Sequence, residues 1–215
     1  MAKEKNLGKI IRELATTKHF MVFLAVVFAV HFGYALVHQI PPAVDARAYD
    51  TIAQNLVTAG EYRLGTGAVG EMDGAIYKIG PGYEFFLAAV YLVFGHHFWL
   101  VWALQALMYT AAVLMLAALA GAVFNKEEKI NWGALYAGVA PAAFFIDGIL
   151  LSGMLMGEVL FIFMAVMAMA AFYVWGEKPT VGRSAVLGFL LGALYLIRPV
   201  GVVFILAFGG AKLAR

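Results

Sequence analysis

The chain of 215 residues is 64% hydrophobic and 13% charged, with a net charge of +2. Soluble domains are about 45–50% apolar and about 25% charged, so this composition, with a mean hydropathy of +0.87, excludes a soluble globular protein. The absence of cysteine excludes disulfides and thiolate chemistry. We therefore expect an integral membrane protein of the all-α class, a polytopic helical bundle.

The chain begins with a basic amphipathic segment. Residues 1–18 carry five Lys or Arg side chains, and Leu7, Ile10, Ile11 and Leu14 recur at helical spacing on one side. This pattern predicts a helix at the cytoplasmic membrane interface, with the N-terminus inside.

The first predicted span follows at residues 19–39, an apolar run about long enough to cross a bilayer. A cleaved signal peptide is the alternative interpretation. The run exceeds a typical hydrophobic region of about 7–15 residues, however, and no A-x-A cleavage site follows it. We therefore expect a membrane anchor and place residues 40–95 on the outer face.

Residues 40–95 are predicted to form an outer loop with two juxtamembrane helices. Pro41 and Pro42 end the first span, and the spacing predicts an amphipathic helix with Asp45 as N-cap and Gly60 at its end. After a glycine-rich stretch, Pro81 opens an apolar segment that is short for a crossing and favours a second surface helix or a re-entrant one.

The remaining spans are predicted within residues 97–215. Apolar runs favour crossings at 98–124, 132–151 and 154–175, followed by two shorter runs on either side of Arg198 and Pro199. The shorter runs favour either a helical hairpin or one kinked helix. With the hairpin, both termini and the short loops that contain Lys or Arg fall on the cytoplasmic side.

Candidate reactive residues begin just after the first span. Asp45 is a candidate catalytic carboxylate, and a purely capping role worth about 0.5–2 kcal/mol is the alternative. Tyr49 lies one helical turn further on the same side, where it can orient Asp45 or anchor in the interface. Asp50 lies off that face and is expected to be solvated.

Three more charged residues complete the candidate set. Glu158 is expected about a turn inside its span, where a carboxylate costs about 2.5–3.5 kcal/mol and normally faces a cavity or a partner. Arg198 can bind a lipid phosphate, snorkel to the interface or pair with Glu158. Lys78 precedes a predicted helix start and suits a phosphate, with a plain interfacial lysine as the alternative.

The histidines do not form a convincing metal site. His31 and His38 are seven residues apart without an acidic partner nearby, and His96 and His97 lack ligand spacing, so all four are expected at the interface. No cofactor is certain from the sequence, and a divalent cation stays open.

The order of these features resembles a known enzyme family. The first outer loop is similar to that of membrane glycosyltransferases of the GT-C superfamily, in the branch of protein mannosyltransferases and aminoarabinose transferases. The similarity is carried by the run from Asp45 through Tyr49 to Leu56, by Gly60, by Gly80-Pro81-Gly82-Tyr83, by Phe94-Gly95 and then by Gln105, Pro141, the 152–158 segment and Arg198-Pro199.

The resemblance implies an enzyme that uses a polyprenyl-phosphate-linked sugar. Asp45 would act as general base on an acceptor hydroxyl or amine, and the anomeric carbon would be attacked in a single inverting displacement. Lys78 and Arg198 would neutralise the leaving phosphate. Tyr49 and Glu158 would contact the substrate from the walls of the cavity.

The resemblance covers nearly the whole chain, from the first span to the end, and residues 1–215 are expected to form a single transmembrane module. Family members are usually about twice as long or more. A truncation, one half of a split enzyme with a partner chain for the missing C-terminal part, and a reduced family member are the three alternatives. A non-catalytic polyprenyl-phosphate-binding or assembly subunit is the alternative function. The expected partners are the lipid-linked sugar and membrane lipids, without nucleic acid, and the expected location is the cytoplasmic membrane.

Overall fold

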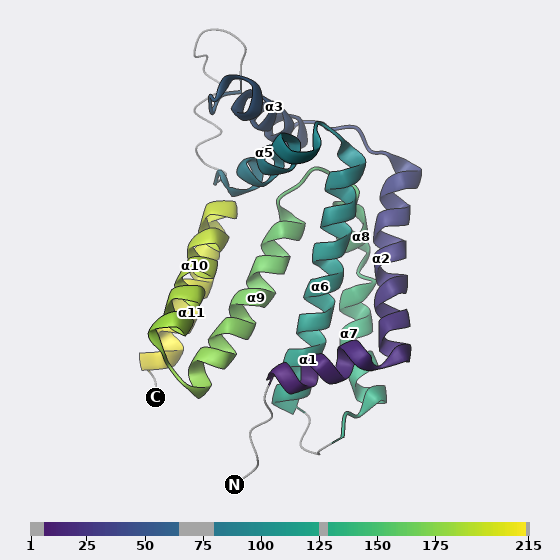
Figure 1. Cartoon of the computed structure of the whole chain (residues 1–215), viewed down its shortest axis with the longest axis vertical. Coiled ribbons are helices and arrows are strands. Elements are labelled where there is room, and N and C mark those ends of the chain that lie inside the picture. The colour runs from purple at the N-terminus through teal and green to yellow at the C-terminus, as the bar shows by residue number, and fades with distance from the viewer. Residues whose placement is uncertain (1–6, 65–79, 125–128, 214–215) are drawn as a thin grey trace.

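The computed structural model describes residues 7–64, 80–124 and 129–213, and these ranges are all-helical (Figure 1). They form ten α-helices and one short 3₁₀ helix. In chain order these are α1 Leu7–Thr16, α2 Lys18–His38, α3 Asp45–Ala59, α5 Gly82–Phe94, α6 Phe98–Phe124, α7 Trp132–Ala143, α8 Ile146–Ser152, α9 Glu158–Glu177, α10 Val181–Ile197, the 3₁₀ helix η1 Pro199–Gly201 and α11 Val202–Leu213.

Three of the described helices are long and apolar enough to cross a membrane, namely α2, α6 and α9. The pair of α7 and α8 makes a fourth candidate if it counts as one span, although its axis bends by 52°. The predicted all-α class is confirmed, and three to four candidate spans indicate a multi-pass membrane protein. The helices α5 and α10 are apolar but shorter.

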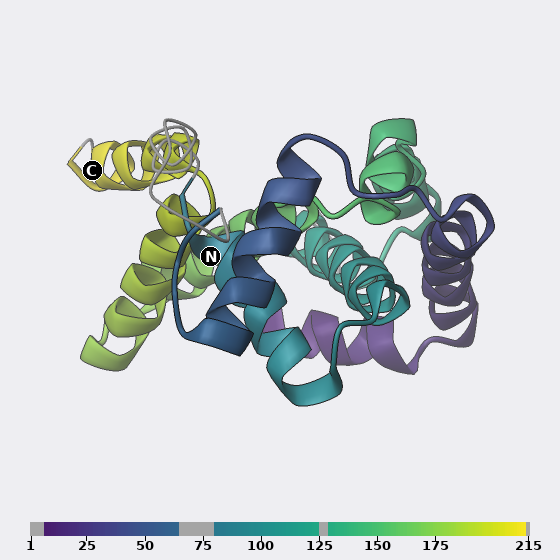
Figure 2. The same ribbon diagram turned by 90° about the horizontal axis from the view of Figure 1, so that it is seen from above.

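The long helices stand side by side, with short helices across both ends. α6 packs against both α2 and α9. In Figure 1, α3 and α5 lie across one end of this bundle, and α1 lies across the other. Figure 2 looks down on α3 and α5. We refer to these as the α3–α5 end and the α1 end.

The apolar stripe of α1 packs against the bundle. Leu7, Ile10 and Leu14 are buried in a hydrophobic cluster with side chains of α2 and α6. A Cβ atom at Gly121 of α6 would lie 3.2 Å from Ile10 Cγ2, so the two helices are in close contact. The apolar stripe of α1 therefore packs on α6. The sequence pattern alone predicts that it contacts the membrane interface.

The crossing predicted at residues 132–151 is not one helix, since it is broken between α7 and α8. α7 ends at Ala143, two residues after Pro141, which lacks an amide donor. The carbonyls of Ala142 and Ala143 accept hydrogen bonds from the Tyr109 hydroxyl at 2.7 Å and from His31 Nε2 at 3.0 Å. Neighbouring helices therefore satisfy backbone groups that the break leaves unpaired within the apolar layer.

His31 is fully buried, which corrects the expectation of an interfacial side chain. Its Nδ1 lies 2.7 Å from the hydroxyl oxygen of Ser152, and its Nε2 faces the Ala143 carbonyl. Because a carbonyl only accepts, Nε2 donates to Ala143, and Nδ1 lies within hydrogen-bond distance of the Ser152 hydroxyl, which itself donates to the Gly148 carbonyl at 2.8 Å. This side chain ties α2 to the ends of α7 and α8.

α10 and α11 form a hairpin, which decides between the two alternatives for the C-terminal segment. Phe204, at the start of α11, packs on Phe161 near the start of α9, with ring centroids 6.2 Å apart. Phe208 stacks on Phe172, further along α9, at 4.2 Å. α11 therefore runs in the direction of α9 and opposite to α10 (Figure 1).

Candidate functional site

Close backbone contacts bring three helix ends together at the α3–α5 end. A Cβ atom at Gly82 would lie 2.8 Å from the backbone nitrogen of Ile197, and one at Gly157 would lie 3.3 Å from Tyr83 Cβ. The N-terminus of α5 thus touches the C-terminus of α10, and the N-terminus of α9 touches α5. Residues that follow these contacts in the sequence are therefore neighbours in space.

We expect Gly82→Ala to lower the free energy of unfolding by about 1–3 kcal/mol, because overpacking against the Ile197 backbone forces the helices apart. Gly192→Ala in α10 is the matched control, since nothing lies within 4 Å of its Cβ position and Ala favours a helix over Gly by about 0.5–1 kcal/mol. Thermal unfolding in detergent measures both variants. Equal unfolding temperatures for the two would contradict the close contact.

Glu158 and Arg198 form an ion pair, in which Arg198 Nη2 donates to Glu158 Oε1. Glu158 is the first residue of α9, and Arg198 is the C-cap of α10. Each charge therefore lies at the helix end whose dipole favours it. The expectation of Glu158 a turn inside its helix is wrong, and of the alternatives for Arg198 the structure shows pairing with Glu158.

Tyr49 projects from α3 toward the junction, by which we mean the place where the ends of α5, α9 and α10 meet. Its side chain is buried, and its ring packs edge-on against Tyr83 of α5 with ring centroids 5.3 Å apart. Burial is the main cause that raises the pKa of Tyr49 to about 12. Three nearby carboxylates also raise this pKa and one guanidinium lowers it. In order of effect these groups are Glu84, Arg198, Asp45 and Glu158.

Asp45 lies at the exposed beginning of α3. It is the first residue of the helix rather than its N-cap, and the N-cap position, Val44, makes no side-chain hydrogen bond. The predicted capping role is therefore wrong, whereas the predicted helix end at Gly60 is confirmed. Val44 has a φ of +47°, a conformation that costs a β-branched residue about 1–3 kcal/mol. The backbone is strained directly before the candidate base.

Glu84 is a candidate that the sequence interpretation missed. It is only 1% exposed, and the Tyr62 hydroxyl donates to its Oε1 at 3.2 Å. Its Oε2 is buried and has no hydrogen-bond partner among the described residues. Burial raises the pKa of Glu84. The available signal was a single charge in the otherwise apolar segment that follows Gly82.

The raised pKa of Glu84 predicts a pH-dependent stability. An unfolded glutamate has a pKa of about 4.3, so the contribution of Glu84 is present below this pH and is lost as the pH rises through the higher folded value. We expect the wild type to become less stable than Glu84→Gln as the pH rises, by about 1.4 kcal/mol per unit of pKa difference.

Thermal unfolding from about pH 4 to about pH 9 measures this difference. Glu177→Gln, at an exposed position in the last turn of α9, is the control, and its difference from the wild type should stay constant. A constant difference for Glu84→Gln as well would contradict the burial of an ionisable Glu84.

The prediction of a solvated Asp50 is wrong, since this residue is 8% exposed. Its Oδ1 accepts from the Tyr91 hydroxyl and from His96 Nε2, both at 2.8 Å. Its Oδ2 accepts from Gln54 Nε2 at 2.9 Å. These bonds join α3 to α5 and to the turn before α6, and they hold the neighbouring Tyr49 in place.

Gln105 of α6 links the first turn of α5 to the turn before α9 by hydrogen bonds. The Tyr83 hydroxyl donates to its Oε1 at 2.7 Å. Its Nε2 donates to the carbonyls of Ser152 and Met154 at 3.0 Å and 2.8 Å. The first turn of α5 is thereby fixed relative to the turn before α9, so that Glu84 and Glu158 come from rigidly placed helix ends.

Two further sequence predictions concern ligands. Lys78 lies outside the described residues. Within the described ranges, no group of three or more His, Asp or Glu side chains is arranged to hold a metal ion. The divalent cation therefore stays an open alternative for which these ranges offer no ligand set.

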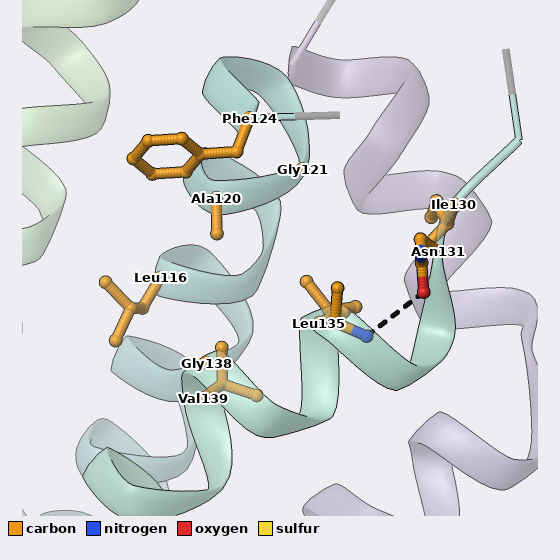
Figure 3. Close-up of a pocket in the computed structure, with 10 residues that line it drawn as sticks. Leu116, Ala120, Gly121, Phe124, Ile130, Asn131, Leu135, Gly138 and Val139 are labelled. Atoms are coloured by element: carbon orange, nitrogen blue, oxygen red, sulfur yellow. Dashed lines mark hydrogen bonds between the residues drawn. The ribbon is translucent and has the colours of Figure 1, made fainter. Parts of the chain in front are cut away.

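Two cavities lie at the opposite end of the bundle. One of about 590 Å³ opens between α6 and α7, and its lining includes Leu116, Phe124 and Leu135 (Figure 3). Another of about 560 Å³ lies between α6, α9 and α11 and shares Leu116 and Phe124 with the first. Both linings are mostly apolar, although Asn131 contributes to the first and Glu177 to the second. The candidate chemistry therefore lies away from these cavities, at the α3–α5 end.

Four of the five predicted residues lie at the α3–α5 end, where Glu158 and Arg198 are paired and the charges of Asp45, Glu158 and Arg198 act on Tyr49, and Glu84 is a fifth residue there. We call this set, Asp45, Tyr49, Glu84, Glu158 and Arg198, the polar cluster. It combines an exposed carboxylate that can take a proton with a guanidinium that can bind an anion. Comparison of the chain with protein-family models, with curated proteins and with solved structures found no match in any of the three.

Proposed function

We propose that the chain is a GT-C-type glycosyltransferase, or the N-terminal membrane module of one, that uses a polyprenyl-phosphate-linked sugar. One observation carries this proposal. The Tyr49 hydroxyl, four residues after Asp45 on α3, lies in the electrostatic field of Glu158 and Arg198, which come from helices more than 100 residues later in the chain. The proximity of four residues that the family resemblance selects, Asp45, Tyr49, Glu158 and Arg198, supports the proposal.

The proposed topology places the α3–α5 end outside the cell. Basic residues concentrate on the short segments near the α1 end, and short loops rich in Lys and Arg stay in the cytoplasm. These residues are Lys9, Arg12, Lys129, Lys178 and Arg183. With this orientation, α3 and α5 are juxtamembrane helices on the outer face of the cytoplasmic membrane.

The proposed reaction is a single inverting displacement. The acceptor oxygen or nitrogen attacks the anomeric carbon, its proton passes to the Asp45 carboxylate, and the bond from the anomeric carbon to the phosphate oxygen breaks. The leaving polyprenyl phosphate keeps the electron pair, and Arg198 stabilises this charge. A positioned general base typically accelerates such a step by about 10²–10⁴.

Glu158 is proposed to position Arg198. Only Nη2 of the guanidinium is used in the ion pair, and its other N–H groups make no hydrogen bond within the described part of the chain. A guanidinium has five donors, so enough remain for bidentate contact with a phosphate.

The alternative is a non-catalytic polyprenyl-phosphate-binding or assembly subunit that works with a partner chain. The Glu158–Arg198 pair favours this alternative in one respect, since it neutralises the guanidinium before any phosphate binds. The pair would then hold a lipid for a second chain that performs the transfer.

A transfer assay separates the two functions. The purified full chain in nanodiscs receives undecaprenyl phosphate carrying glucose, mannose or aminoarabinose, with peptide and lipid acceptors, and mass spectrometry follows the release of undecaprenyl phosphate. Release from one donor, dependent on an acceptor, supports the enzyme. Binding without release favours the assembly subunit, and the absence of both contradicts both functions.

A further inference from the structure

Two carboxyl oxygens of the polar cluster are buried without a hydrogen-bond partner among the described residues, Glu84 Oε2 and Glu158 Oε2. The first oxygen of each group is occupied, by the Tyr62 hydroxyl and by Arg198 respectively. Buried polar groups in proteins are nearly always paired, and an unpaired one is costly. Each carboxyl therefore has one oxygen that is held by the protein and one buried oxygen whose hydrogen-bonding capacity no described residue uses.

The two free oxygens belong to the same junction. Glu84 and Glu158 lie in the first turns of α5 and α9, each one residue beyond the contact between Tyr83 and Gly157. Both charges act on the hydroxyl of Tyr49. The Asp50 and Gln105 networks hold these helix ends in place, so the free oxygens are pre-organised rather than left by loose packing.

The chemistry of these oxygens selects the ligand. A carboxylate oxygen accepts hydrogen bonds, and a protonated carboxyl both accepts and donates. A phosphate diester brings only acceptors, and a lipid chain brings no polar atoms at all. A sugar brings several hydroxyl groups in a rigid arrangement, which suits two fixed carboxyl groups.

We propose that Glu84 and Glu158 bind hydroxyl groups of the donor sugar, beside the phosphate held by Arg198. This inference rests on the proposed function and assigns the sugar-binding part of the same site. Glu158 bridges the two parts, since its Oε1 holds Arg198 while its Oε2 faces the sugar. The hydroxyl next to the anomeric carbon is a neighbour of the phosphate, so one carboxylate can contact both.

Binding of two lipids to the full chain in nanodiscs tests this assignment. The probes are undecaprenyl phosphate and undecaprenyl phosphate carrying glucose, and native mass spectrometry measures both affinities. We expect the wild type to prefer the sugar-bearing lipid by about tenfold, the effect of one hydrogen bond to a charged group. Glu84→Leu should lose this preference and keep its affinity for undecaprenyl phosphate.

Glu84→Gln is the second variant, which the stability argument above expects to fold even if the leucine variant does not. It should weaken the preference, because the amide can donate to a sugar hydroxyl but replaces a bond to a carboxylate by a weaker neutral one. Glu177→Gln is the matched control and should keep the preference in full.

The outcomes separate the inference from the proposed function. A sugar preference that persists in both Glu84 variants overturns the inference and leaves the proposed function standing, and so does a wild type that binds both lipids equally. A wild type that binds neither lipid overturns both.

Discussion

Asp45→Asn is expected to abolish sugar transfer, with a loss of about 10²–10⁴ in rate, while expression and folding stay nearly unchanged. The amide cannot take the acceptor proton, and this is the only function of the side chain that the reaction needs. Little stability should be lost, because Asp45 is exposed and makes no capping hydrogen bond. The measurement is the rate of undecaprenyl phosphate release in the transfer assay.

Asp147→Asn is the matched control for this prediction. Asp147 is also an exposed aspartate in the first turn of a helix, α8, but it does not belong to the polar cluster. Its substitution should leave the transfer rate unchanged. If Asp45→Asn transfers sugar at the wild-type rate, the role of Asp45 as general base is wrong.

Arg198→Gln is expected to weaken the binding of undecaprenyl phosphate by about 10-fold or more and to destabilise the fold. The loss of binding follows from the missing phosphate contact. The loss of stability follows from an unpaired Glu158, whose side chain is 23% exposed. Because this pair is partly solvated, we expect a cost of about 1–3 kcal/mol, below the 3–5 kcal/mol of fully buried pairs.

A double substitution separates these two effects. Glu158→Gln with Arg198→Gln removes both charges, so it should recover most of the lost stability and none of the lost affinity for the phosphate. Thermal unfolding and native mass spectrometry with undecaprenyl phosphate measure the two quantities. If the double variant binds the lipid as well as the wild type, Arg198 has only a structural role.

The spans could be predicted from the sequence because they depend on the length of apolar runs. The break between α7 and α8 could not be placed this way. Pro141 is visible in the sequence, but a broken helix in an apolar layer also needs hydrogen-bond donors for its free backbone carbonyls. Those donors are Tyr109 and His31, 33 and 112 residues away from the carbonyls that they bond. Only the packed bundle shows that they are present.

The candidate site could be predicted only in part, because the sequence shows unusual charges but not the contacts between helices. Glu158 and Arg198 stood out as rare charges beside apolar runs, and Asp45 and Tyr49 stood out by their position after the first span. Glu84 did not, since its significance comes from burial between helices.

Asp50 was misjudged because helical periodicity considers only its own helix. On α3 it lies off the apolar stripe, which predicts a solvated carboxylate. Its partners Tyr91 and His96 come from residues 41 and 46 positions later, and they meet Asp50 only because α5 packs against α3. Polar networks between helices cannot be predicted from the pattern of one helix.

A cryo-electron microscopy structure of the full chain in nanodiscs with undecaprenyl phosphate carrying glucose tests the central claim most directly. The account predicts density for the phosphate against the Arg198 guanidinium, with the sugar between Glu84 and Glu158 and with Asp45 facing the anomeric carbon. Phosphate density elsewhere, with the lipid in the apolar cavities at the α1 end and the polar cluster empty, would contradict it.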